Sequence, residues 1–152
     1  MQAPARSRSA EFVEFTVAAS FFALVTVFLT YPLAFHPGSL GYRLQDAGDA
    51  QYSVWNVAWV AHALLTDPLH VLDANIFYPD RGTLIYSEAN LVAGALAVPV
   101  YWWTRNPFAA HNSVLLMSFI LSALGTYYLV RYLCEDRRAA AHVVARAKQP
   151  SD

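Results

Sequence analysis

Two aspartates, Asp46 and Asp49, stand three residues apart at the start of the stretch DAGDAQYSVWNVAWVAHALLTDP, which covers residues 46–68. A carboxylate within hydrogen-bond reach of a hydroxyl group can take up its proton and act as a general base. An aspartate in this position can also cap a helix, because its side-chain oxygen accepts the free backbone N–H groups of the first turn. The sequence leaves both roles open for Asp49, and for Asp46 the functional role is the less favoured of the two.

The residues that follow Asp49 fit a helix with two different faces. On helical spacing, Tyr52 and Asn56 lie near Asp49, where they are candidate substrate-binding groups. A second face carries three ring side chains: Trp55, Trp59 and His62. Tryptophan rings favour the headgroup level of a membrane, so this face predicts a short helix near residues 50–66 that lies on the bilayer surface.

Further candidate binding residues lie in the polar, aromatic stretch that comes next. Asp73, Asn75 and Tyr78 could line a substrate groove, although the same residue types are also typical of turns. Glu88 precedes an apolar segment, where a carboxylate is costly unless it is paired or faces water. A role in binding is therefore plausible for Glu88, or an ion pair with Arg81 or Arg105.

The composition indicates that lipid surrounds the elements that position these residues. The chain has 152 residues, of which 57% are hydrophobic and only 14% are charged, whereas a soluble domain normally carries about a quarter charged residues. The net charge of −1 excludes a basic surface for nucleic acid. A single cysteine, Cys134, excludes an intrachain disulfide.

Two apolar segments, residues 12–36 and 108–133, are long enough to cross the roughly 30 Å hydrocarbon layer as helices of about 20 residues. The first is too long for the apolar part of a cleaved signal peptide, which favours a retained anchor. A third apolar segment, residues 91–103, is shorter and contains Pro99, so we expect it to be interfacial or re-entrant. Its end carries an aromatic cluster, which favours an interface belt over stacking on a sugar: Tyr101, Trp102 and Trp103.

Basic residues precede the first predicted span and follow the second, which places both termini in the cytoplasm. Residues 37–107 then form an extracytoplasmic loop with interfacial helices near 50–66 and 87–103. Residues 1–11 form a cytoplasmic N-terminus, and residues 134–152 a cytoplasmic tail. The predicted fold class is an all-α membrane protein with two transmembrane helices joined by this loop.

The order of these features resembles the N-terminal part of the GT-C superfamily of polytopic membrane glycosyltransferases, which includes protein O-mannosyltransferases and lipid A aminoarabinose transferases. In those enzymes an anchor span is followed by an outer loop that begins with an acidic pair, here Asp46-Ala-Gly-Asp49. The wider pattern, GDA.Y..WN..W..HAL..DP.H..DANIFYP followed by TL.YSE, is similar to large bacterial membrane proteins that are GT-C-like or uncharacterised. The resemblance covers about residues 11–134.

The resemblance implies transfer of a sugar from a polyprenyl-phosphate donor to an acceptor at the outer face of the bacterial inner membrane. The family's first-loop aspartate acts on the acceptor as general base or helps to hold a divalent cation, and Asp49 matches that position best, with Asp46 second. Aspartate oxygens suit Mg²⁺ or Mn²⁺. The implied partners are the lipid bilayer and the polyprenyl-phosphate-linked sugar.

The superfamily's members have many more spans than this chain. We therefore expect a truncated or split N-terminal module that depends on missing spans for catalysis. The alternative that the sequence leaves open is a non-catalytic two-span protein that assembles with a larger membrane-protein chain. A transporter subunit is the weakest possibility, because ionisable side chains are lacking in the middle of the predicted spans.

Overall fold

The structure is a computed structural model that describes residues 8–39 and 48–147, with side chains through Cys134. Its elements are α1 (Arg8–Leu29), η1 (Leu33–Phe35), α2 (Gly48–Thr66), η2 (Pro68–His70), η3 (Thr83–Tyr86), α3 (Leu91–Thr104) and α4 (Pro107–Ala147). The described residues form helices and no strand, which confirms the predicted all-helical class. The chain divides into two compact units, which are described separately: residues 25–118, called the loop unit, and residues 1–24 with 119–152, called the helix-pair unit.

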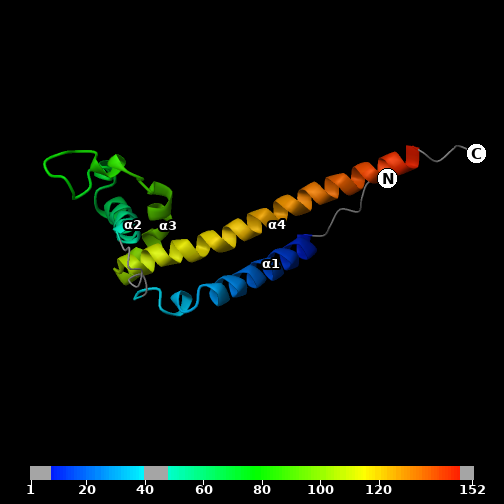
Figure 1. Cartoon of the computed structure of the whole chain (residues 1–152), viewed down its shortest axis with the longest axis horizontal. Helices are drawn as coiled ribbons and strands as arrows, with labels where there is room; N and C mark the ends of the chain where they lie inside the picture. Colours follow the sequence, from blue (N-terminus) through cyan, green and yellow to red (C-terminus); the bar gives the residue numbers. More distant parts are fainter. Residues whose placement is uncertain (1–7, 40–47, 148–152) are drawn as a thin grey trace, which may run out of the picture. The chain divides into compact units, whose positions relative to one another are not determined.

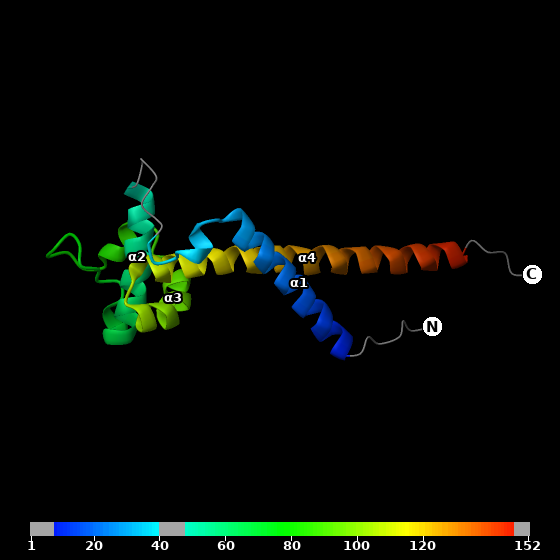
Figure 2. The same cartoon turned by 90° about the horizontal axis from the view of Figure 1, so that it is seen from below.

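The loop unit is built on the packing of α2 against α3, which lie side by side in both views (Figure 1, Figure 2). Small residues line the contact, and Val57, Ala61, Ala97 and Ala110 form a buried cluster. Gly94 of α3 is the point of closest approach, because a Cβ atom there would lie 2.3 Å from the Cβ atom of Val60. The absence of a side chain at Gly94 therefore sets how closely α2 and α3 pack.

A second buried cluster joins α2 to the segment between η2 and η3. Val60, Ala74 and Leu84 are its buried members. Two hydrogen bonds hold the segment's ends together: Leu84 N–H donates to the Leu72 carbonyl at 3.0 Å, and the Thr83 hydroxyl donates to the Ala74 carbonyl at 3.0 Å. Residues 72–84 consequently form a closed loop that covers one side of α2.

Asparagines fix the start of α4 within the loop unit. The Asn106 side-chain oxygen accepts the N–H groups of Phe108 at 2.9 Å and Ala109 at 3.1 Å, which makes Asn106 an N-cap before Pro107. Its side-chain amide donates to the Gly38 carbonyl at 3.0 Å. Asn112, one and a half turns further on, donates to the Pro37 carbonyl at 2.7 Å. The residues that follow α1 and η1 are thereby held against the first turns of α4.

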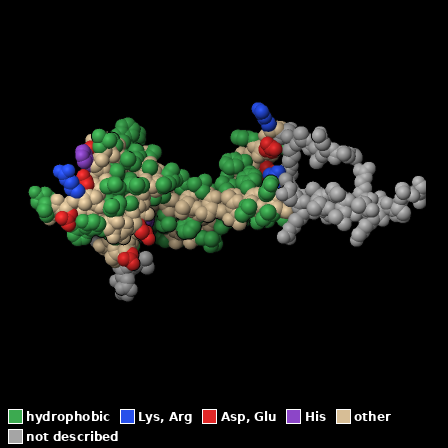
Figure 3. All heavy atoms as spheres, turned by 90° about the horizontal axis from the view of Figure 1, so that it is seen from above, with side chains coloured by type: hydrophobic (Ala, Val, Ile, Leu, Met, Phe, Trp, Pro, Cys, Tyr) green, Lys and Arg blue, Asp and Glu red, His purple; other side chains and the backbone are tan. Residues whose placement is uncertain are grey.

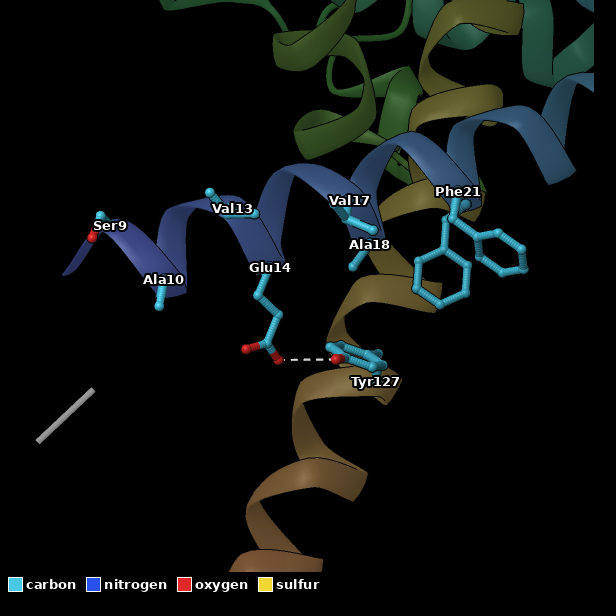
Figure 4. A pocket seen from close by; sticks show the side chains of 9 residues that line it. Ser9, Ala10, Val13, Glu14, Val17, Ala18, Phe21 and Tyr127 are labelled. Carbon is cyan, nitrogen blue, oxygen red and sulfur yellow. Dashed lines mark hydrogen bonds between the residues drawn. The ribbon is translucent and has the colours of Figure 1, made fainter. Parts of the chain in front are cut away.

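The helix-pair unit contains the first part of α1 and the later part of α4. The Tyr127 hydroxyl donates to the Glu14 carboxylate at 2.9 Å, as Figure 4 shows, and Arg131 forms an ion pair with the same carboxylate. The rings of Phe22 and Tyr127 meet edge to face at 6.3 Å. Glu14 is thus paired by residues of α4, as expected for a carboxylate in an apolar helix.

Two described helices, Arg8–Leu29 and Pro107–Cys134 within α4, are long and apolar enough to cross a membrane, by length and composition. The first begins before the predicted residue 12 and ends before the predicted residue 36. Pro32 and Pro37 account for the early end, because proline lacks the N–H group that continues a helix. The second continues as helical backbone to Ala147, beyond the predicted boundary at residue 133, through the alanine-rich sequence AAAHVVARA.

The close packing at Gly94 predicts that Gly94→Ala destabilises the protein. The added methyl group must displace Val60, and overpacking of this kind costs about 1–3 kcal/mol of the free energy of unfolding. Gly125→Ala in α4 is the matched control, because a Cβ atom there meets no atom within 4 Å and alanine favours a helix over glycine by about 0.5–1 kcal/mol. Denaturant unfolding in detergent micelles measures both variants. Equal stability of the two variants would contradict the packing argument.

Candidate functional site

Asp49 lies in the first turn of α2 and is exposed. Its carboxylate is therefore near the positive end of the helix dipole, which stabilises a negative charge. Asp46 lies outside the described residues. Within the part of the chain that the structure describes, no group of three or more His, Cys, Asp and Glu side chains could hold a metal ion, so Asp49 has no metal site around it there. The predicted Mg²⁺ or Mn²⁺ site stays a prediction.

A groove of about 630 Å³ has Gly48, the residue before Asp49, in its lining, and Asp49 itself is not a lining residue. We call it the aromatic groove, because four of its lining residues carry aromatic rings. Its lining comes from the start of α2 and from the closed loop and η3: Gly48, Gln51, Tyr52, Trp55, Ile76, Phe77, Thr83, Tyr86 and Ser87. The predicted binding residue Tyr52 thus lies in the same wall as the residue that precedes Asp49.

Phe77 has a left-handed backbone, with a φ angle of 58°. For a bulky residue this conformation costs of order 1–3 kcal/mol and persists only where the surroundings impose it. The closed loop on either side of Phe77 imposes it here. The Phe77 ring remains 63% exposed and lies 6.0 Å from the ring of Tyr86, so the strained backbone presents an aromatic ring at the groove.

Asn56 is fully buried and acts within the protein interior. Its side-chain N–H donates to the Glu88 carbonyl at 2.5 Å and lies 3.4 Å from the Tyr52 hydroxyl. Its side-chain oxygen is buried without a hydrogen-bond partner among the described residues. The buried Asn56 therefore ties α2 to the segment before α3, and its role in substrate binding stays a prediction.

Asp73 also has a structural partner. Its carboxylate accepts the Gly82 N–H at 2.7 Å, across the closed loop. Gly82 has a φ angle of 66°, a conformation that glycine adopts without strain. The structure accordingly gives Asp73 the role in turn formation that the sequence offered as the alternative to binding.

The remaining predicted residues lie apart from one another. Tyr78 is 97% exposed and Glu88 is exposed, and both lie outside the lining of the aromatic groove. Among the described residues, no ion pair joins Glu88 to Arg81 or Arg105. Asn75 is exposed and lines a second pocket.

The second pocket, which we call the inner pocket, has a volume of about 500 Å³. Residues of α2, α3 and the start of α4 surround it together with Asn75: Gln51, Val54, Trp55, Ala58, Trp59, His62, Tyr101, Pro107 and Phe108. Gln51 and Trp55 line both this pocket and the aromatic groove. The two pockets of the loop unit are therefore neighbours on either side of these two side chains.

Sequence reasoning did not identify the inner pocket, although it singled out some of its residues. The indole N–H of Trp59 donates to the Val71 carbonyl at 3.0 Å and its ring packs on the closed loop, while the predicted position of this helix on a bilayer surface stays a prediction. The His62 ring lies 6.2 Å from that of Trp59 and 6.3 Å from that of Tyr101. Tyr101 is half-buried, whereas Trp102 and Trp103 next to it are exposed. The sequence signal for this pocket was the helical spacing of three ring side chains, Trp55, Trp59 and His62.

Charge is sparse on the surface of the loop unit. In Figure 3, at the left, hydrophobic side chains cover much of the visible face, and the Lys, Arg, Asp, Glu and His side chains lie mainly at its margin. His70 is paired with Asp67 at 2.9 Å in an exposed position at η2. Large exposed apolar residues include Val92, Leu96 and Trp103 on α3. Such a surface is typical of contact with lipid or with another protein.

The hydrogen bond of Asp73 predicts that Asp73→Ala opens the loop over residues 72–84. The Gly82 N–H then loses its acceptor, and an unpaired group of this kind costs about 1–3 kcal/mol. Asp73→Asn is the matched control, because asparagine keeps an oxygen that can accept the same N–H. Hydrogen exchange of the Gly82 amide measures the effect. Exchange that is as slow in Asp73→Ala as in the wild type would contradict the assignment.

Comparisons with protein-family models, with curated proteins and with solved structures find no match to this chain. The function is accordingly argued from the geometry of Asp49 and the two pockets.

Proposed function

We propose that this chain is the N-terminal module of a GT-C-like membrane glycosyltransferase, which transfers a sugar from a polyprenyl-phosphate donor to an acceptor at the outer face of the bacterial inner membrane. One observation carries the proposal: Asp49, an exposed carboxylate, directly follows Gly48, which lines the aromatic groove. A base and a binding groove are the two parts that the acceptor side of such a reaction requires.

In the proposed reaction Asp49 takes the proton from an acceptor hydroxyl held in the aromatic groove. The acceptor oxygen then forms a bond to the anomeric carbon of the donor sugar. The bond between that carbon and the phosphate oxygen breaks, and polyprenyl phosphate leaves with the electron pair. The described residues do not by themselves make a metal site, so no step is assigned to a cation.

The helix-pair unit supports a hairpin topology for the proposed enzyme. Glu14, near the start of α1, pairs with Arg131, near the end of the apolar part of α4. Contact between these two ends supports placing both termini on one side of the membrane, and the basic flanks favour the cytoplasm. Residues 37–107, which contain the lining of both pockets apart from Phe108, then lie outside, where a polyprenyl-phosphate sugar is used.

An accessory role is the second candidate function. The helix-pair unit contains an apolar pocket of about 760 Å³, whose lining includes Val13, Val17 and Phe21 of α1 (Figure 4). An opening of this size between two apolar helices could receive side chains of another membrane-protein chain. In that case the chain would assemble with a larger partner and carry no catalytic group.

The topology predicts a labelling pattern for cysteines in spheroplasts treated with a membrane-impermeant maleimide. Ser39→Cys and Ser87→Cys, each in a Cys134→Ser background, should react, because residues 37–107 lie outside. The natural Cys134 is the matched control and should react only after permeabilisation, although it is exposed on the protein. Labelling of Cys134 in intact spheroplasts, or protection of both introduced cysteines, would contradict the proposed orientation.

The catalytic role of Asp49 predicts that Asp49→Asn lowers sugar transfer by about 10²- to 10⁴-fold, because asparagine cannot take up the proton. Helix capping would survive this change, since asparagine caps about as well as aspartate. Membrane vesicles with the complete protein and its partners are given a panel of polyprenyl-phosphate hexoses, and release of polyprenyl phosphate is measured. Asp67→Asn, outside both pockets, is the matched control. Full activity of Asp49→Asn would contradict the catalytic role, and release that does not depend on the chain would favour the accessory role.

A further inference from the structure

We propose that the inner pocket binds an uncharged pyranose ring, and that this ring is the sugar handled at the site next to Asp49. The inference deepens the proposed glycosyltransferase function and rests on it for the second part. The first part, binding of a neutral sugar, rests on the chemistry of the lining alone.

Among the described residues, none of the ten that line the inner pocket is Asp, Glu, Lys or Arg. A charged ligand would lose its hydration there without gaining a counter-charge. The pocket therefore favours a neutral ligand over a phosphate, a carboxylate or an ammonium group.

Four aromatic residues line the inner pocket: Trp55, Trp59, Tyr101 and Phe108. The C–H groups on one face of a pyranose make an apolar surface that packs on such rings. Trp59 is held in place by its hydrogen bond to Val71 and by the neighbouring His62 ring. The platform is thus formed before a ligand arrives, which lowers the entropy cost of binding.

Two side-chain amides complete the recognition of hydroxyl groups. Gln51 and Asn75 are exposed, lie in the lining, and make no side-chain hydrogen bond within the described residues. An amide has donors and an acceptor, and a sugar hydroxyl both donates and accepts, so each amide can bind a hydroxyl in either sense. An apolar platform with a few polar groups is the usual composition of a small-molecule site.

The place of the inner pocket relates the bound sugar to the reaction. Gln51 and Trp55 line both the inner pocket and the aromatic groove, and Gly48, the residue before Asp49, also lines that groove. The volume of about 500 Å³ lies within the range of about 300–1,000 Å³ that is usual for ligand pockets. A pyranose in the inner pocket would therefore lie next to an acceptor in the aromatic groove, and the substrate class is a neutral hexose, not a cationic amino sugar.

The test measures binding of simple glycosides to the full chain in lipid nanodiscs that contain no glycosidic detergent. Saturation-transfer NMR, with irradiation of the aromatic protons, is recorded with the methyl α-glycosides of mannose, glucose and galactose. We expect transfer to the ring protons of at least one of these probes. The methyl glycosides of glucosamine and glucuronic acid should bind more weakly by about tenfold or more, because their charges lack partners in the pocket.

Two variants locate the binding site without disturbing the fold. Gln51→Leu and Asn75→Leu should each weaken binding of the best probe by about 3- to 10-fold, the usual effect of losing one hydrogen bond to a neutral group. Both residues are exposed and make no hydrogen bond that supports the fold in the described part of the chain. Trp103→Leu is the control for loss of an aromatic ring, because Trp103 is 85% exposed and lies outside the lining; it should leave binding unchanged.

The proposal is overturned if no neutral glycoside receives saturation, if the charged glycosides bind as well, or if Gln51→Leu and Asn75→Leu bind the probe like the wild type. The binding test involves no donor, acceptor or proton transfer. A failure of the glycosyltransferase proposal, seen as full activity of Asp49→Asn, can therefore be told apart from a failure of the sugar subsite. Binding that is lost in both leucine variants supports the subsite whichever result Asp49 gives.

Discussion

The close approach of α2 and α3 at Gly94 and Val60 is the constraint on which the loop unit depends. Because no side chain separates the helices there, the small residues on either side, such as Ala61 and Ala97, become fully buried. The same close approach brings Tyr101 of α3 to the face of α2 that carries Trp59 and His62. A larger residue at position 94 would separate the two walls that enclose the inner pocket. Formation of the inner pocket therefore depends on the packing of α2 against α3.

The closed loop lies along α2 and forms the second wall of the aromatic groove. Hydrogen bonds at Asp73 and Thr83 join its two ends, and the buried side chain of Leu84 anchors it on α2. Within that closure Phe77 is held in a left-handed conformation that an open loop would relax. The strain is offset by the contacts of the loop as a whole, and its result is an aromatic ring displayed at the groove beside the start of α2.

The described residues that line the two pockets include no Asp, Glu, Lys or Arg side chain. Their linings contain aromatic, amide and hydroxyl groups, and two exposed carboxylates directly follow lining residues of the aromatic groove: Asp49 after Gly48, at the end of the helix where negative charge is favoured, and Glu88 after Ser87. In the helix-pair unit, by contrast, a carboxylate does lie among apolar residues, and there Glu14 is neutralised by an ion pair with Arg131. At Asp49 and Glu14 the charge lies at a helix end or in an ion pair, as an apolar environment requires.

The helical class and the two long apolar helices follow from the sequence alone, and the helices predicted near residues 50–66 and 87–103 are found at Gly48–Thr66 and Leu91–Thr104, because periodicity, length and proline positions act locally. The sequence also determined which residue types are available for chemistry. The tertiary structure decided how they are used: Asn56 and Asp73 are engaged by backbone groups 32 and 9 residues away, which no local pattern encodes. Likewise, the face of α2 that carries Trp55, Trp59 and His62 packs on the closed loop and on α3. The sequence could not show this, because helical periodicity identifies an apolar face but does not distinguish contact with protein from contact with lipid.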